Sequence, residues 1–283
     1  GSAQEEWNLE KCIYEALDKS LLIRQFELNK QGYDITGKQL RMERLPSLNA
    51  NTNTGVSFGR VINPATNTFV TENSFYQSVG ANSGVLLFNG FRLQNSIRQN
   101  DLYVDAATED IQQAKNDLAL NVALAYLNVL FAYENAEIAQ ARVDLSRDQL
   151  KDLDILIREG ARPENDRFDI LAQVAGDEQA LITAQNNIEI NMLSLKQQMW
   201  LEPDFPLEIE RPELDFTTLD DLENETFETV YQLELTTQPQ IKASEIRKDA
   251  SEKGIDIARS QTMPTLSLGA EIGTNWSDFD QEV

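Results

Sequence analysis

The sequence predicts a mixed fold in which long antiparallel α-helical hairpins are continuous with strands of a transmembrane β-sheet. Three observations support this prediction. Polar and apolar residues alternate with period two over three segments of ten or more residues, and a heptad pattern runs without Pro or Gly over 91–158. A unit of helix, proline and strand also recurs after 218 residues. Alternation with period two indicates strands, and a sustained heptad indicates coiled-coil-like helices.

The composition excludes several classes of function. The 283 residues carry 24 Lys and Arg against 47 Asp and Glu, which gives a net charge of −23. Such a chain repels phosphates, so we expect no nucleic-acid partner. Histidine, the commonest metal ligand and general base, is absent. The single Cys12 excludes an internal disulfide, and we expect it to be a small buried residue. We therefore predict no metal, no cofactor and no enzymatic activity.

The alternating segments are Leu48–Phe58, Ser74–Phe88 and Thr265–Trp276. In each, one face is mainly apolar and the other is rich in Asn, Ser and Gly. A soluble antiparallel sheet would have the same pattern, but soluble strands average only about five or six residues. Strands of about ten residues suit a tilted crossing of a bilayer. No run of 18 apolar residues occurs, so no transmembrane helix is expected.

The link 59–74 between the first two strands is rich in Asn, Thr and Pro, as an exposed loop would be. Two strands cannot close into a barrel, since small barrels need about eight. Lipid does not tolerate open strand edges. A membrane sheet of this kind therefore requires several chains to share one barrel.

The segment 91–158 predicts one very long helix with two apolar surfaces. A seam with heptad spacing contains many alanines, which allow close approach of a second helix. A second apolar flank indicates packing partners on another side, although an ordinary helical bundle remains an alternative. The seam comprises Val122, Ala125, Val129, Ala132, Ala136, Ala139, Val143, Leu150, Leu153 and Ile157, and the flank comprises Leu120, Leu124, Leu127, Phe131, Ile138 and Leu145.

A charged turn then separates the long helix from a returning helix over Arg167–Trp200. Gly160 suits a left-handed helix C-terminus, and Pro163 cannot continue the preceding hydrogen-bond ladder. Asp166 is a candidate N-cap of the returning helix. Together the two helices predict a hairpin whose tip is either a solvated turn or a docking site.

An internal repeat organises the chain. The segment that begins at Ile23 matches the one that begins at Ile241, and both run from a helix through Pro (Pro46 and Pro264) into a strand. The second copy stops at Val283, after its first strand. We therefore expect periplasmic helices at 5–44, a β-hairpin at 45–90, a long helical hairpin at 91–200, an equatorial linker at 201–237 and a truncated second copy at 238–283.

The order of several short motifs resembles that of the TolC-like outer membrane efflux protein family. These motifs are "RMERLPSL" at 41–48, "LFNGF" at 87–91 and "VALAYLNVLFA" at 122–132, and their duplication covers nearly the whole chain. The resemblance implies a homotrimer with a shared twelve-stranded β-barrel in the Gram-negative outer membrane and an α-helical tunnel in the periplasm. It also implies a periplasmic adaptor and an inner-membrane pump as partners. Lipid would contact the apolar strand face, and the polar face would line the lumen.

The resemblance places two functional regions on this chain. The hairpin tip would dock on the adaptor and gate the tunnel, and "LFNGF" places Asn89 and Gly90 at the strand-to-helix turn. Asp166 and Asp169 compete for one aligned position, because the tip is longer than the usual family spacing. Gate residues of the second hairpin have no counterpart in this sequence. The tip candidates are Arg158, Gly160, Ala161, Arg162, Pro163, Asp166 and Asp169.

The predicted function is passive conduction through an export duct of an efflux or type I secretion system. Drugs, metal ions and proteins all remain possible cargo. The acidic stretches 219–225 and 277–282 have no phosphate-loop, nucleophile or metal-site spacing, and we expect them to be solvated surface. The alternative is a structural coiled-coil rod with a small β head.

Overall fold

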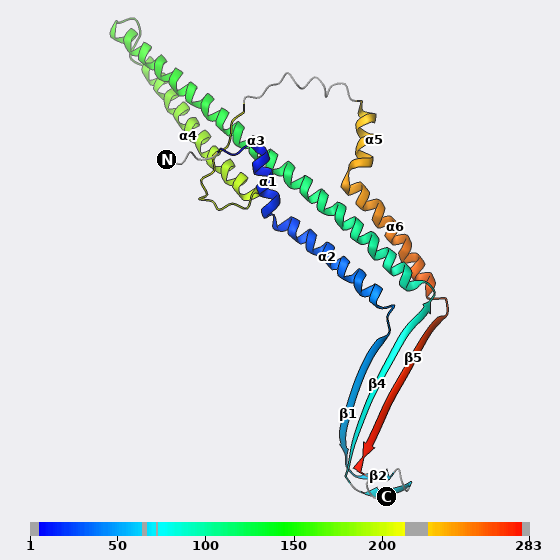
Figure 1. Cartoon of the computed structure of the whole chain (residues 1–283). Coiled ribbons are helices and arrows are strands. Elements are labelled where there is room, and N and C mark those ends of the chain that lie inside the picture. The colour runs from blue at the N-terminus through cyan, green and yellow to red at the C-terminus, as the bar shows by residue number, and fades with distance from the viewer. Residues whose placement is uncertain (1–5, 64–66, 72, 213–225, 279–283) are drawn as a thin grey trace. The chain divides into compact units, whose positions relative to one another are not determined.

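The computed structural model describes residues 6–63, 67–71, 73–212 and 226–278. Within them, Figure 1 shows long helices and long strands. In chain order the elements are α1 (Leu9–Lys19), α2 (Leu21–Met42), β1 (Ser47–Ser57), β2 (Arg60–Asn63), β3 (Thr68–Thr71), β4 (Ser74–Asn89), α3 (Arg92–Arg158), α4 (Asp166–Gln198), α5 (Phe227–Thr237), α6 (Pro239–Ser260) and β5 (Thr265–Ser277).

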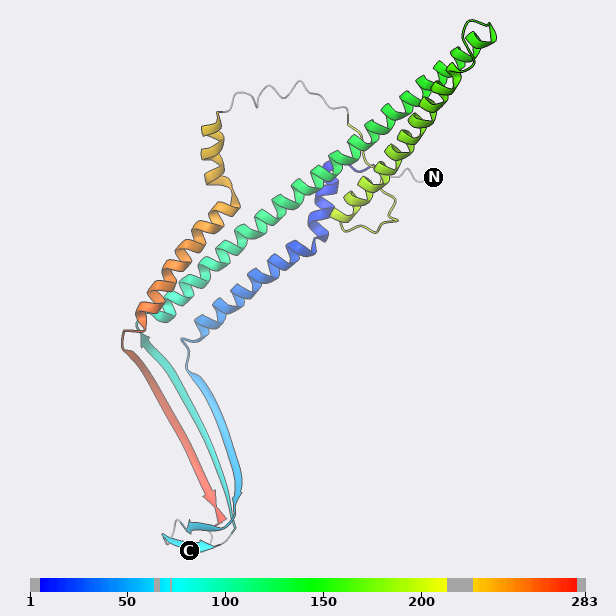
Figure 2. The same ribbon diagram turned by 180° about the vertical axis from the view of Figure 1, so that it is seen from behind.

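The chain divides into two compact units. Residues 1–28 and 109–241 form the first, and residues 29–108 and 242–283 form the second. In the first unit, α3 and α4 run antiparallel and side by side, as Figures 1 and 2 show from opposite directions. This arrangement confirms the predicted long helical hairpin.

The apolar seam of α3 forms the core of the first unit. Val122 and Val129 are fully buried and belong to one cluster with Leu195 of α4 and with Cys12 and Ala16 of α1. Small seam residues, which allow helices to approach closely, are also buried: Ala125, Ala132 and Ala139. The predicted seam is thus the packed face of α3, and Cys12 is buried as expected.

A short main-chain ladder closes one end of this core. Trp7 pairs with Ile209 in a parallel bridge, and the Tyr126 hydroxyl donates a 2.5 Å hydrogen bond to the Glu210 carbonyl.

Burial raises the pKa of the Cys12 thiol to about 11. Burial is also the main cause that raises the pKa of the Tyr126 hydroxyl to about 12, and the nearby Cys12, Glu210 and Glu6 raise it further. Both groups are therefore neutral at physiological pH.

The second unit contains an antiparallel sheet in the order β1–β4–β5. These strands coincide with the three alternating segments of the sequence and confirm them. The register places the apolar faces of the three strands on the same side of the sheet, since Ala50 lies opposite Ala81 and Ala81 lies opposite Ile272. A bulge between Leu86 and Phe88 shifts the β4–β5 pairing near its end.

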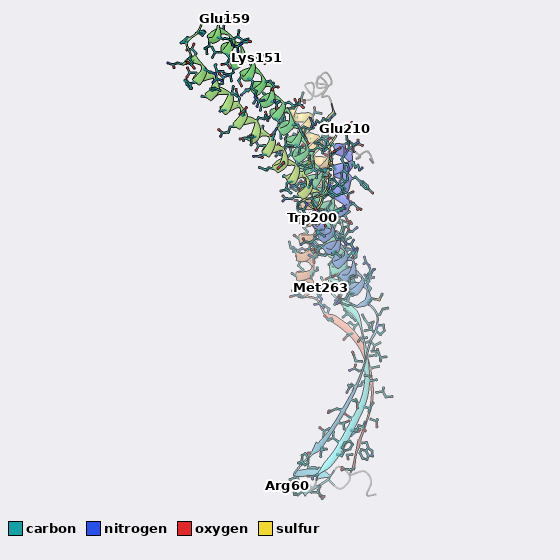
Figure 3. The ribbon with its side chains drawn as sticks, turned by 90° about the vertical axis from the view of Figure 1, so that its left-hand side faces the viewer. Arg60, Lys151, Glu159, Trp200, Glu210 and Met263 are labelled. Atoms are coloured by element: carbon teal, nitrogen blue, oxygen red, sulfur yellow. The ribbon has the colours of Figure 1, made fainter. Side chains whose placement is uncertain are left out.

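The link between β1 and β4 has more regular structure than the sequence indicated. β2 and β3 pair antiparallel, with Ile62 opposite Phe69, and the Arg60 guanidinium lies 4.4 Å from the centre of the Phe69 ring. Aromatic and β-branched residues within this otherwise polar link favour pairing. In Figure 3, Arg60 marks this end of the sheet, and Met263 lies at the opposite end.

The internal repeat is visible in the element boundaries. Helices α1 and α5 have 11 residues each, α2 and α6 have 22 each, and every start is displaced by 218 positions. Strand β5 likewise begins 218 positions after β1. Because α5 begins 218 positions after α1 and has the same length, it is the second copy of α1, and it lies within the predicted linker 201–237.

Candidate functional site

The closed end of the α3–α4 hairpin is shaped by a left-handed glycine. Gly160 has φ +74°, and its N–H donates to the Ile157 carbonyl at 2.9 Å. The Ala161 N–H donates to the Leu156 carbonyl at 2.8 Å. These paired bonds form a Schellman motif, which favours Gly because a side chain is strained at positive φ. The predicted role of Gly160 as a helix C-terminal residue is confirmed.

The start of α4 differs from the sequence prediction. Asn165, rather than Asp166, is the N-cap residue, and its side chain makes no capping hydrogen bond. Asp166 is the first helical residue, and its carboxylate accepts a 3.3 Å hydrogen bond from Arg162. The expectation that Asp166 caps α4 is therefore wrong, because its carboxylate pairs with Arg162 across the turn. Asp166 and Asp169 still place negative charge in the first helical turn.

Two ion pairs join the helices of the hairpin, one near the tip and one about three helical turns away from it. Arg167 Nε lies 2.8 Å from Asp154 Oδ1, and Arg147 lies 2.7 Å from Glu178. Such exposed pairs contribute about 0–1 kcal/mol each, so they orient the helices more than they stabilise them. In Figure 3, Lys151 and Glu159 mark this end of the hairpin.

The tip presents its side chains to solvent. Arg158, Ala161, Arg162, Pro163 and Asp169 are exposed, and a Cβ on Gly160 would face open space. The sequence analysis missed Phe168, which is 66% exposed in the first turn of α4. The signal was its place between the charged residues Arg167 and Asp169 directly after the turn, although Leu171 and Ala172 lie at helical spacing from it.

The second candidate region is the turn from β4 into α3. Gly90 and Phe91 have φ values of +66° and +63°, and the Asn89 side chain accepts a 3.3 Å hydrogen bond from the Leu93 N–H. A Cβ on Gly90 would lie 2.7 Å from both the Ser260 carbonyl oxygen and the Met263 Cβ. Gly90 therefore lets this turn lie against the link between α6 and β5.

The β1–β4–β5 sheet has one apolar and one polar face, and both are accessible. On the apolar face Leu48 and Ile272 are each 78% exposed. The polar face has cross-strand sets of Asn, Ser and Gly, and Glu271, opposite Asn82, is the only charged residue in these three strands. This polar face carries a shallow depression of about 470 Å³ lined by Asn51, Asn82 and Glu271 among others.

The second apolar flank of α3 is also uncovered. Phe131 is 65% exposed, and the rest of the flank is at least 39% exposed: Leu120, Leu124, Leu127, Ile138 and Leu145. The same helix thus has a buried seam toward α1 and α4 and an open apolar surface elsewhere. Large exposed apolar surfaces indicate contacts with protein or lipid.

The described residues contain no group of three or more metal-ligating side chains. A bilayer-crossing helix is likewise not found in the part of the chain that the structure describes. The acidic stretch 219–225 and most of 277–282 lie outside the described residues.

Comparison with known proteins identifies the family. The family model for outer membrane efflux proteins matches residues 12–199, which is more than half of the chain. A search of the curated proteins finds no match to this sequence.

Solved structures share the fold. The chain superposes on CusC, described for its folding and transmembrane channel formation, with a TM-score of 0.80, 18% identity, and coverage of 97% of this chain and 63% of CusC. For the outer membrane protein VceC from Vibrio cholerae these values are 0.77, 18%, 95% and 62%. For the Campylobacter jejuni CmeC outer membrane channel they are 0.76, 15%, 95% and 60%.

The chain therefore spans less than two thirds of the length of these channels. Its antiparallel helical hairpin and antiparallel strands resemble half of a TolC-type channel. The family match and the shared fold agree with each other. This chain belongs to the outer membrane efflux protein family.

Proposed function

We propose that the full-length protein is the exit duct of a tripartite efflux or type I secretion system in the Gram-negative outer membrane. The observation that carries this proposal is the sheet with two accessible faces. Its strands β1, β4 and β5 have 11, 16 and 13 residues, enough to cross a bilayer at a tilt. Its exposed apolar face suits lipid, and its Asn-rich face suits a water-filled lumen.

The duct is a homotrimer in this proposal. Among the described residues, the three-stranded sheet leaves the outer edges of β1 and β5 unpaired, and lipid requires such edges to be closed by further strands. Four strands from each of three copies would form a twelve-stranded barrel. The open flank of α3, centred on Leu124 and Phe131, provides an apolar surface for a neighbouring helix in the tunnel wall.

The hairpin tip is the docking site for a periplasmic adaptor, and through the adaptor for an inner-membrane pump. Exposed Arg side chains and an exposed aromatic residue are the side chains that most often anchor protein interfaces. Arg158 at the end of α3, Arg162 in the link and Phe168 at the start of α4 provide both kinds of side chain. The Arg167–Asp154 ion pair near the tip helps to orient α3 and α4 for this contact.

Single-channel conductance of the full-length gene product tests the duct. Trimers in a planar bilayer should give uniform conductance steps, and a salt gradient should give a cation-selective reversal potential. Glu271→Gln should reduce that selectivity without reducing the step size, since Glu271 carries the only charge of these strands. Folded trimers that stay silent even with the adaptor present, or a water-soluble elongated dimer, would contradict the proposal and favour the coiled-coil rod.

The tip has a separate test in export measurements. Arg158→Glu should impair export while the amount of trimer in the outer membrane stays unchanged. Lys151→Glu is the matched control, because Lys151 is an exposed cation on the same helix about two turns before the tip. Equal export by both variants would remove Arg158 from the docking surface.

A further inference from the structure

A cavity of about 460 Å³ lies within the first unit, and none of its lining residues belongs to the hairpin tip. Its walls come from the α1–α2 junction, from α3 and from the end of α4. Phe26 and Leu22 line one side, and Trp200 lines another. This volume is in the range of small-molecule sites in proteins, about 300–1,000 Å³.

Trp200 is held in a strained backbone conformation beside this cavity. Its φ is +57°, and its N–H donates to the Gln197 carbonyl at 3.2 Å, while the Leu201 N–H donates to the Lys196 carbonyl at 3.0 Å. These bonds form a Schellman motif like the one at Gly160, but with the bulkiest side chain at the position that favours glycine. The conformation costs about 1–2 kcal/mol. It leaves the indole 53% exposed at the cavity wall.

The polar part of the wall is acidic and includes an unsatisfied acceptor. Asp110 and Asp117 are the only charged residues among those that line the cavity. The Gln113 amide nitrogen donates a 2.8 Å hydrogen bond to Asp117, which fixes the orientation of the Gln113 side chain. Gln113 Oε1 is buried, and within the described part of the chain it has no hydrogen-bond partner. A buried acceptor of this kind is costly unless something donates to it.

We propose that this cavity binds a small organic cation that has an aromatic body and an N–H-bearing ammonium group. The ammonium would pair with Asp117 and donate to Gln113 Oε1, and the aromatic body would lie against Trp200 and Phe26. Indole faces attract cations, and apolar walls favour a desolvated ring. The acidic wall excludes anionic ligands such as nucleotides.

Residue-specific fluorine NMR tests this proposal with 2-phenylethylammonium as the probe. The full-length protein is labelled with 5-fluorotryptophan, and the resonance that disappears in Trp200→Phe is that of Trp200. The probe should shift the Trp200 resonance saturably and leave the other tryptophan resonances unchanged. Neutral 2-phenylethanol should need a concentration at least about threefold higher for the same shift, because it lacks the charge.

Two variants separate the charge from the hydrogen bond. Asp117→Asn should weaken binding about three- to tenfold, whereas Asp144→Asn should not, although Asp144 accepts the same i,i+4 bond from Gln140 on the same helix. Gln113→Met should weaken binding of 2-phenylethylammonium. It should leave binding of its trimethylated analogue unchanged, since that cation has no N–H to donate.

Three outcomes would overturn the proposal. The first is an unshifted Trp200 resonance at saturating probe, and the second is equal binding of the alcohol and the ammonium. The third is a Trp200 resonance that moves only when the oligomer dissociates on dilution, which would make the cavity a contact between copies of the chain.

Discussion

Helices α1 and α5 are two copies of one element, yet they differ in what their faces contact. Each has 11 residues and begins with a side-chain cap, since Asn8 accepts from Lys11 N and Thr226 from Thr229 N. In α1, Cys12 and Ala16 are fully buried against the α3–α4 hairpin. In α5, the residue equivalent to Ala16 is the exposed Glu234. Helix formation is therefore a local property of both copies, whereas burial depends on the surface that each copy meets.

The largest expected effect comes from exchanging these equivalent residues. Ala16→Glu puts a carboxylate without a counter-ion at a fully buried position, which should lower the free energy of unfolding by about 3–5 kcal/mol. Glu234→Ala changes an exposed helical position and should alter it by less than about 0.5 kcal/mol. Urea unfolding followed by circular dichroism measures both. Similar losses in the two variants would mean that α5 is packed like α1.

A second comparison joins the copies at Gly90, where the first copy contacts the second. Gly90→Ala places a methyl group 2.7 Å from the Ser260 carbonyl oxygen and adds positive-φ strain, so we expect a loss of about 2–4 kcal/mol. Gly160→Ala is the control, because its φ of +74° is similar but its surroundings are open. The free energy of unfolding of that control should fall by only about 1–2 kcal/mol in the same urea titration. Equal losses would show that the contact with Ser260 relaxes without cost.

Much of this organisation could be predicted from the sequence because it follows from periodicity. Alternation over 48–58, 74–88 and 265–276 predicts strands whatever they pack against, and the alanine-rich heptads of α3 predict its buried seam. The repeat was also readable, since a proline follows each copy of the helix at 46 and 264. These features depend on residues close together in the chain.

Other features depend on contacts that no local pattern encodes. Asp166 looked like an N-cap, but the position of Arg162 four residues earlier offered its carboxylate a stronger partner. The left-handed Trp200 breaks the preference for glycine, so propensity argues against it. The cavity at Trp200 brings together residues from three segments of the chain, and no single segment indicates it. The docking role of the tip remains a prediction.

A smaller effect concerns the pH dependence of stability, which Cys12 in the first copy should make steeper at alkaline pH. Burial raises the pKa of Cys12 from 9.0 to about 11, so the neutral thiol stabilises the fold below pH 9. Between pH 9 and 11 the unfolded thiol ionises while the folded one resists, and stability should fall as pH rises. The second copy has Val230 at the equivalent position. Cys12→Val should therefore flatten the decline in the urea midpoint over this range, and an unchanged slope would assign the decline to Tyr126 or to other groups.

The smallest expected effect concerns the helix junctions, where the two copies satisfy the same donor differently. In the first copy the Ile23 N–H donates to the Ser20 hydroxyl at 3.2 Å, and in the second the Ile241 N–H donates to the Gln238 carbonyl at 3.1 Å. Removal of the buried Ser20 hydroxyl leaves a donor without that acceptor, so Ser20→Ala should lower the free energy of unfolding by about 1 kcal/mol. Gln238→Ala keeps the main-chain acceptor, and Pro239 has no N–H to satisfy. The free energy of unfolding of Gln238→Ala, measured with urea, should stay within about 0.5 kcal/mol of that of the parent. A loss for Gln238→Ala as large as that for Ser20→Ala would mean that the glutamine side chain, rather than the main chain, holds the second junction.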